Sequence, residues 1–137
     1  MRQITADKLP PCIHAFIETV NAADSARFLA CFAKDALVND VQRDFLGTQA
    51  IKAWSDREVM VGEVVLKIHR AFEHYGDYVV EVHTDGNFDK THLPDPLIIT
   101  QHMSVRDNKI VKMITMLVKP ADVSVEDALA ANAGATK

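Results

Sequence analysis

The sequence is short of the residue types on which several kinds of site depend. It has two cysteines and five glycines in 137 residues. Cys12 and Cys31 are far apart and form no CxxC grouping, so we expect buried free thiols rather than metal ligands or a redox pair. The glycines fall singly at turn positions, which predicts no glycine-rich loop to hold a phosphate.

Metal-binding spacing is also missing. The chain has six histidines, but none are paired as HxH or HxxxH, and they fall on different predicted segments. Structural and catalytic metal sites bring such ligands together at short, regular spacings. We therefore expect no metal and no other cofactor.

Neither strong positive charge nor a long apolar run is present. The net charge is −4 and lysines and arginines are scattered singly, which argues against a nucleic-acid surface. No apolar run approaches the ~18 residues that span a bilayer, so no membrane partner is expected. The first residues lack the apolar core of a signal peptide, which favours a cytoplasmic location.

Three helices are predicted in the first half of the chain. The first begins at Leu9, where apolar residues start to recur at helical spacing. A second follows a cap at Asp24 or Ser25 and carries an apolar stripe over 28–32. The third follows residues 37–46, which contain two short strands, and ends near residues 57–62.

From Glu63 onward the hydrophobic period changes from 3.6 to 2, which predicts strands. Gly76-Asp77 and Asp107-Asn108 are hairpin signals between consecutive strands. Residues 85–96 form a long polar connection with prolines. The strands predicted between these features cover residues 64–72, 78–85, 97–106 and 109–119.

The chain therefore divides into a loose arm (1–8), one domain (9–120) and a tail (121–137). A domain of this size buries roughly 68–70% of its unfolded surface, enough for a core that contains a pocket. Helices followed by antiparallel strands indicate an α+β fold. We expect the N-terminal helices to pack on the concave face of a strongly curved, mostly antiparallel sheet, forming a cone with a central pocket.

This layout resembles the nuclear transport factor 2-like superfamily, also called the cystatin-like cone, and within it the SnoaL-like group. The similarity covers about residues 9 to 119. Four phrases carry it: FIETVNAAD, CFAKDALVND, FLGTQAIKAW and MSVRDNKIVKMITML. Their order and spacing matter more than any one phrase, and the superfamily is mixed in function.

Ketosteroid isomerase, a more distant relative, implies positions for catalytic groups. Its general base is an aspartate after the first long strand, which matches Asp40 in Val-Asn-Asp. Its two oxyanion donors match Phe16 and Gln101. Phe16 cannot donate a hydrogen bond, and Gln101 does so only as an amide, which weakens the expectation of that reaction because one lost donor costs ~10²–10³ in rate.

Two interpretations of Asp40 remain open from the sequence. It is either a general base in an apolar pocket, suited to removing a proton beside a carbonyl, or a solvated turn acid paired with Arg43. Gln101 is predicted to line the pocket and hold a polar atom of the ligand. The other predicted ligand contacts are apolar or aromatic, and plain core packing is the alternative for them: Phe16, Phe28, Trp54, Tyr78, Val82, Met103, Met113 and Leu117.

Three functions follow as hypotheses. The first is a cofactor-independent isomerase or cyclase that uses Asp40 as its base. The second is a non-catalytic binding protein for a small apolar or carbonyl-containing ligand. The third is a dimerisation module with a filled core. His83 and His102 alternate onto the sheet face away from the pocket, where we expect a second copy of the chain to form a homodimer.

Overall fold

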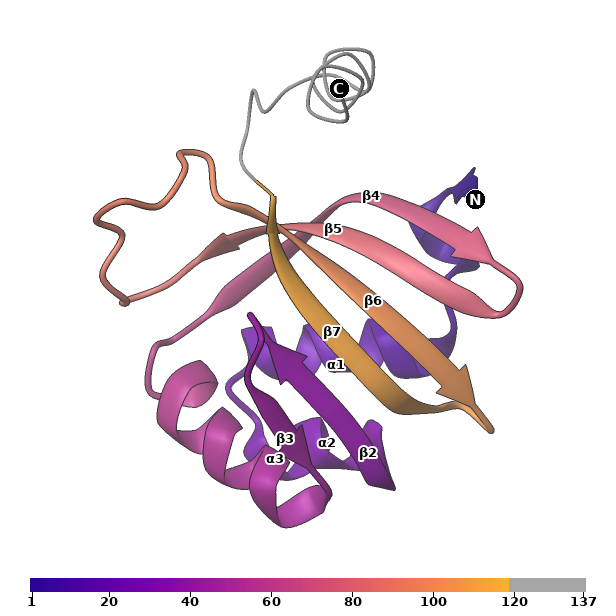
Figure 1. Cartoon of the computed structure of the whole chain (residues 1–137), viewed down its shortest axis with the longest axis horizontal. Coiled ribbons are helices and arrows are strands. Elements are labelled where there is room, and N and C mark those ends of the chain that lie inside the picture. The colour runs from indigo at the N-terminus through magenta and orange to yellow at the C-terminus, as the bar shows by residue number, and fades with distance from the viewer. Residues whose placement is uncertain (119–137) are drawn as a thin grey trace, which may run out of the picture.

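Helices and strands separate along the chain as the change of hydrophobic period predicts (Figure 1). The computed structural model describes residues 1–118. Its helical elements are η1 (Ala6–Lys8), α1 (Pro11–Asn21), α2 (Ser25–Ala30), α3 (Thr48–Trp54) and the π-helical turn η2 (Ser55–Met60). Its strands are β1 (Arg2–Ile4), β2 (Phe32–Asp40), β3 (Asp44–Leu46), β4 (Val65–His74), β5 (Asp77–Asp85), β6 (Ile98–Arg106) and β7 (Lys109–Val118).

The strands form a seven-stranded sheet in the order β1-β4-β5-β6-β7-β2-β3. Neighbouring strands run antiparallel except β2 and β7, which pair in parallel. The predicted α+β class is confirmed. The strong curvature that the resemblance implies stays a prediction.

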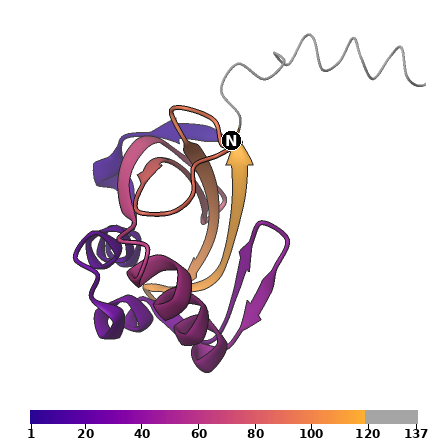
Figure 2. The ribbon, with the colours of Figure 1, turned by 90° about the vertical axis from the view of Figure 1, so that its left-hand side faces the viewer.

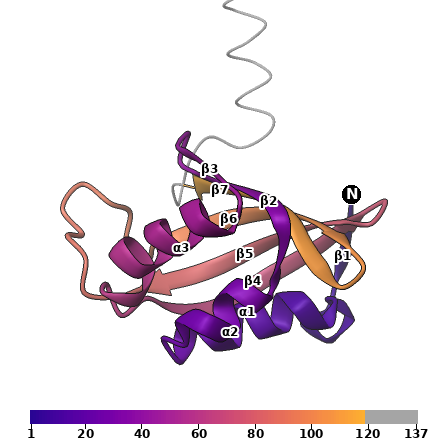
Figure 3. The ribbon, with the colours of Figure 1, turned by 90° about the horizontal axis from the view of Figure 1, so that it is seen from below.

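The helices lie on one face of the sheet, as Figures 2 and 3 show from two directions. The amphipathic helix α1 buries a complete apolar stripe, including Ile13 and Phe16, against the strands. Asp24 caps α2, as predicted, by accepting a hydrogen bond from the Arg27 amide at 3.1 Å. At the N-terminal end of α1, the backbone N–H of Cys12 donates to Asn108 Oδ1 at 2.9 Å. This hydrogen bond fixes the start of α1 against the β6–β7 turn.

An aromatic cluster joins the helices to the sheet. Phe28 has no exposed surface, and its ring centroid lies 5.6 Å from Phe16, 5.2 Å from Phe32 and 6.3 Å from Trp54. These centroid separations lie within the range of favourable aromatic pairs, so the contacts stabilise the junction in addition to the apolar area that the rings bury. Phe28 and Phe32 of the predicted apolar stripe are therefore buried, although Phe28 belongs to α2 and Phe32 to β2.

The structure differs from the sequence prediction at three element boundaries. Residues 2–4 are not a loose arm but pair with β4, from Arg2 opposite Glu73 to Ile4 opposite Ala71; a strand this short has too few residues to show alternation. Helix α1 begins at Pro11 rather than Leu9. Strand β2 begins at Phe32, well before the predicted start, and a register irregularity between Phe32 and Leu37 obscures its period.

Both predicted hairpins are present, with small differences in their turns. Tyr75 (φ 49°) and Gly76 (φ 85°) make the first turn, one residue earlier than predicted. Asp107 (φ 52°) and Asn108 (φ 54°) make the second. Two successive positive φ values match the right-handed twist of the flanking strands. The predicted strand end after residue 118 and the tail (121–137) lie outside the described residues.

Candidate functional site: a cavity with a polar row

A cavity of about 460 Å³ lies between the helices and the sheet. Its walls come from α1, α2, the β2–β3 turn, α3 with η2, the start of β4, and the facing strands β5, β6 and β7. The segment after β5 contributes Phe88 and Leu93. The lining is mainly apolar, with a few polar groups, which is the usual composition of a small-molecule pocket.

Asp40 reaches this cavity because of a tight turn. Asp40 and Arg43 exchange backbone hydrogen bonds of 2.9 and 3.2 Å across the β2–β3 hairpin. Val41 (φ 49°) and Gln42 (φ 67°) occupy the two central positions, both in the left-handed region. Such a conformation is strained for β-branched Val41, and backbone strain of this kind concentrates at functional sites.

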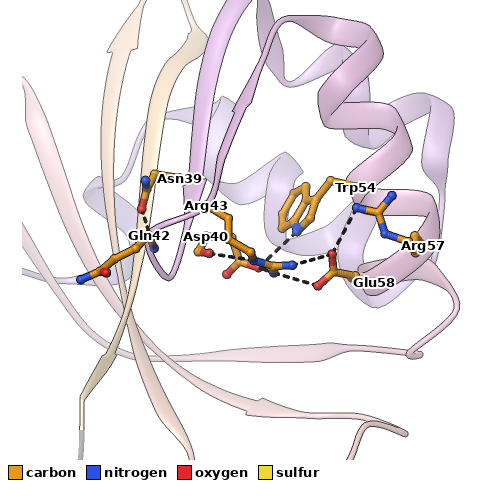
Figure 4. Close-up of polar contacts among 7 residues, drawn as sticks. All are labelled: Asn39, Asp40, Gln42, Arg43, Trp54, Arg57 and Glu58. Carbon is orange, nitrogen blue, oxygen red and sulfur yellow. Dashed lines mark hydrogen bonds and ion pairs between the residues drawn. The ribbon is translucent and has the colours of Figure 1, made fainter.

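The turn places Arg43 between two carboxylates (Figure 4). Arg43 Nη2 lies 2.6 Å from Asp40 Oδ2, and its two terminal nitrogens donate to the Glu58 carboxylate at 3.0 and 2.8 Å. These bonds from Arg43 hold the pKa of Glu58 below its ordinary value. The Glu58 carboxylate, and secondly Asp40, raise the pKa of Arg43. All three side chains line the cavity.

Trp54 also contacts Asp40. Its indole Nε1–H donates to Asp40 Oδ2 at 3.2 Å, so both side-chain donors reach the same carboxylate oxygen. The Asp40 side chain keeps 19% of its surface exposed, and among residues 1–118 no hydrogen bond reaches its Oδ1. The sequence left two interpretations of Asp40 open, and the structure combines their geometries: Asp40 lines the cavity and also pairs with Arg43.

A row of polar residues crosses three strands at this end of the cavity. Thr115 on β7 is paired with Asp40 on β2 and with Gln101 on β6. All three residues line the cavity. With neighbouring strands about 4.8 Å apart, the backbones of Asp40 and Gln101 lie roughly 10 Å from each other. A small molecule can therefore contact both side chains at once.

Gln101 is the most unusual member of this row. Only 4% of its surface is exposed, and its Oε1 is buried without a hydrogen-bond partner among the described residues. Leaving a buried polar group unpaired costs about 1–3 kcal/mol. Native proteins keep few such groups, and one that lines a cavity indicates a place for a ligand's polar atom.

We therefore expect Gln101→Leu to stabilise the free protein. Leucine has a similar size and removes the unpaired amide, so the free energy of unfolding should rise by about 1 kcal/mol in denaturant titrations. Gln49→Leu on the exposed surface of α3 is the matched control and should change stability by less than about 0.5 kcal/mol. A loss of stability in Gln101→Leu would mean that the amide has a partner in the free protein.

The structure brings six of the ten predicted site residues to the cavity lining: Asp40, Phe16, Phe28, Trp54, Gln101 and Leu117. The other four, Tyr78, Val82, Met103 and Met113, do not line it. Tyr78, Met103, Met113 and Val38 form a continuous cross-strand row, which lies nearer the β6–β7 turn where α1 is anchored. The core is filled there, and Met103 and Met113 are almost completely buried. Val82 is also buried, but it lies opposite Ile99, nearer the cavity. Whether any predicted site residue contacts a ligand stays a prediction.

Several lining residues were missed by the sequence reasoning. The sequence does contain a signal for Thr115, because Thr115 alternates with Met113 and Leu117 on the inward face of β7. Glu58 had none, since it lies in a π-helical turn that no simple periodicity reveals. Phe88 and Leu93 come from the long connection after β5, whose path over the cavity depends on tertiary contacts.

A second, larger cavity of about 610 Å³ lies under residues 93–97. Charged side chains contribute to its lining, including Lys67, Asp85 and Lys90, and the last two form an ion pair at 2.6 Å. It shares Thr84 and Leu93 with the first cavity. We assign the candidate site to the smaller cavity because Asp40 and Gln101 both line it, and Gln101 Oε1 has no hydrogen-bond partner among the described residues.

Cys12 and Cys31 are free and buried, and burial raises the pKa of both thiols. Within residues 1–118, no three side chains of histidine, cysteine, aspartate or glutamate are grouped to hold a metal ion. Over the same residues, none of the helices has the length and apolar character needed to cross a membrane.

Comparison with known protein families identifies the chain. The model of the SnoaL-like domain matches residues 13–113, which is most of the chain and includes Asp40 and Gln101 of the polar row. The chain belongs to the SnoaL-like family. Comparison of this SnoaL-like domain with functionally curated proteins finds no match.

Solved structures show the same fold. Protein SMa1630 of Sinorhizobium meliloti, which its description assigns provisionally to the polyketide cyclases, has a TM-score of 0.73 at 18% identity, covering 82% of this chain and 100% of its own. An NTF2-like protein of unknown function from Cytophaga hutchinsonii has a TM-score of 0.64 at 12% identity, over 85% and 92%. The SnoaL-like domain therefore has an NTF2-like fold.

A third structure was solved with a small molecule. It is a protein from Catenulispora acidiphila with a ketosteroid isomerase-like fold, in complex with trimethylamine, and has a TM-score of 0.68 at 16% identity over 85% of this chain and 91% of that one. At these identities the likeness is one of fold. The predicted family resemblance is confirmed, including the ketosteroid isomerase-like neighbours.

Proposed function

We propose that this SnoaL-like domain binds a small molecule with an apolar body and one polar end. The observation that carries the proposal is the buried Gln101 side chain in a mainly apolar cavity, because its Oε1 has no hydrogen-bond partner among the described residues. A protein that needed this space only for packing would gain stability by placing an apolar side chain there. The cavity volume, about 460 Å³, is in the range of small-molecule sites.

The expected binding mode follows from the lining. Phe16, Phe28 and the Trp54 ring contact the apolar body, while the polar row places Gln101 and Asp40 beside the polar end of the ligand. The complex of the Catenulispora protein with trimethylamine shows that a relative of this fold binds a small molecule. A homodimer through the outer face of the sheet remains a prediction of the family resemblance.

Filling the cavity tests the binding function. Ile99 on β6 lines the cavity and is half-buried, so Ile99→Phe should occupy the space and weaken binding of an apolar probe such as tetralin at least about tenfold. Trp54 is the single tryptophan of the chain and lines the same cavity, so its fluorescence reports binding directly.

Ile98→Phe is the matched control. Ile98 is the adjacent residue, is also half-buried and does not line this cavity, because neighbouring strand residues point to opposite faces. The control should bind the probe as the unmodified protein does. Equal binding in Ile99→Phe and Ile98→Phe would show that the probe does not enter the cavity.

Catalysis is the second candidate function, and a specific observation favours it. Asp40 Oδ2 accepts both side-chain hydrogen bonds, which leaves Oδ1 as a base that a substrate proton can reach. In this reading the protein is a cofactor-independent isomerase or cyclase, and Asp40 moves a proton next to a carbonyl. Gln101 would then donate through its amide nitrogen to the carbonyl oxygen.

A further inference from the structure

Two cavities meet at one end of the sheet. The candidate site is the inner cavity, and the larger cavity under residues 93–97 is the outer one. Near the start of β4, Val64 and Leu66 line the inner cavity. Val65 and Lys67, which alternate with them, line the outer cavity. Because successive strand residues point to opposite faces, the backbone of the sheet is the wall between the two cavities.

This wall ends where β5 and β6 separate and residues 86–96 leave the sheet (Figure 1). At the end of the pairing, the Thr84 N–H donates to the Leu97 carbonyl at 2.9 Å. Within residues 1–118, Thr84 and Leu93 are the two residues that line both cavities. Since this hydrogen bond holds the Thr84 backbone in the sheet, a molecule that extends from one cavity into the other has to pass the Leu93 side chain.

Few polar contacts hold Leu93 in place. Asn87 anchors the start of the connection to the turn before β4, through its backbone N–H and its side-chain amide, each at 2.7 Å. In the described part of the chain, one ion pair, Lys90 with Asp85 at 2.6 Å, ties residues 88–96 to the rest. The Leu93 N–H donates to Lys90 within the connection itself. The half-buried Leu93 side chain therefore closes the wall by packing alone.

The inner cavity has another opening, which leads to water. Val41 and Leu117 line the cavity and keep 47% and 42% of their surface exposed. A ligand chain that leaves the cavity there stays in water and gains little affinity. A chain that passes Leu93 would instead bury its methylene groups in the outer cavity, and each fully buried methylene group is worth about fourfold in affinity.

We propose that Leu93 is the specificity-determining residue for the length of the ligand. The proposal deepens the proposed function and depends on it. The Leu93 side chain closes the passage between the two cavities, so the site selects a compact ring system that fits the inner cavity and gains nothing from a long chain. The outer cavity is then a second compartment that Leu93 keeps out of ligand binding.

Ligands with one ring system and chains of increasing length test this selectivity. Tetralin carrying a hydroxyethyl, hydroxybutyl or hydroxyhexyl chain has the same apolar body and the same terminal hydroxyl throughout. Affinities are measured by Trp54 fluorescence, with tetralin as the reference. In the unmodified protein, the hydroxyhexyl and hydroxyethyl ligands should bind within about threefold of each other, because the longer chain stays in water. In Leu93→Ala, the hydroxyhexyl ligand should bind at least about tenfold more tightly than the hydroxyethyl ligand.

Leu97→Ala is the matched control. Leu97 is also half-buried and lines the outer cavity, but it does not line the inner one. Its carbonyl, which accepts the hydrogen bond from Thr84, is kept in alanine. This variant should bind the series as the unmodified protein does. Leu93→Val removes only one methylene group and should give a smaller gain in the same direction, so the test does not depend on the stability of Leu93→Ala alone.

The outcomes separate the two proposals. If chain length already raises affinity at least about tenfold in the unmodified protein, the passage is open and the inference is overturned. The same holds if Leu93→Ala shows no gain with chain length, or if Leu97→Ala shows an equal gain; in each case tetralin still binds and the binding function stands. If tetralin does not change the fluorescence of Trp54, the binding function fails and the inference falls with it.

Discussion

Replacing Phe28 with alanine should lower the free energy of unfolding by about 3–5 kcal/mol. Phe28 is completely buried and contacts the rings of Phe16, Phe32 and Trp54, so its loss removes three aromatic contacts at the junction of helices and sheet. The effect should approach the upper end of the range, because the new void opens into an existing cavity that the surrounding side chains do not fill. Since domains have total stabilities of about 5–15 kcal/mol, this variant would be marginally folded.

Urea denaturation followed by circular dichroism measures this difference without depending on the Trp54 signal. Phe88→Ala is the matched control, since it removes the same ring from a half-buried position in the segment after β5. We expect it to cost less than about 1.5 kcal/mol. Similar losses in both variants would show that the aromatic cluster around Phe28 is not the centre of the core.

Replacing Asp40 with asparagine should lower proton-transfer activity about 100-fold or more if the catalytic function holds. Asparagine keeps the size and the carbonyl acceptor for Trp54 but cannot take up a proton. A suitable assay is the exchange of α-hydrogens of a cyclic α-hydroxyketone in D₂O, followed by NMR. It asks only for proton abstraction and so does not require the natural substrate.

Asp44→Asn provides the control for this experiment. Asp44 lies on the neighbouring strand, accepts a hydrogen bond from Asn39 at 2.7 Å and does not line the cavity. Its variant should exchange hydrogens as the unmodified protein does. An unchanged rate in Asp40→Asn would remove Asp40 as the base and leave ligand binding as the function of the cavity.

The fold could be predicted in large part because its signals are local. The amphipathic stripe of α1, the cap at Asp24 and the turn at Asp107-Asn108 each depend on residues within a few positions. The two elements misread at the start of the chain are those without local signals. Strand β1 exists only because β4 offers it an edge, and the start of β2 is obscured by an irregular register.

The candidate site was predictable only where it coincided with alternation along a strand. Gln101 and Leu117 were identified because their strands show which residues face inward. Met103 and Met113 share that inward face but lie deeper, under the anchored end of α1. Alternation gives the face on which a side chain lies, but not how far along the sheet the helices extend.

The sequence by itself determined the α+β class, the order of the elements, the SnoaL-like resemblance and the position of Asp40 at the end of a strand. Tertiary structure alone decided that Asp40, Thr115 and Gln101 form one row, that Arg43 lies between Asp40 and Glu58, and that Gln101 Oε1 has no hydrogen-bond partner within residues 1–118. The physical reason is that register and packing are set by contacts between segments far apart in the chain. Local patterns specify which residues can be buried, whereas only those distant contacts fix what each buried polar atom meets.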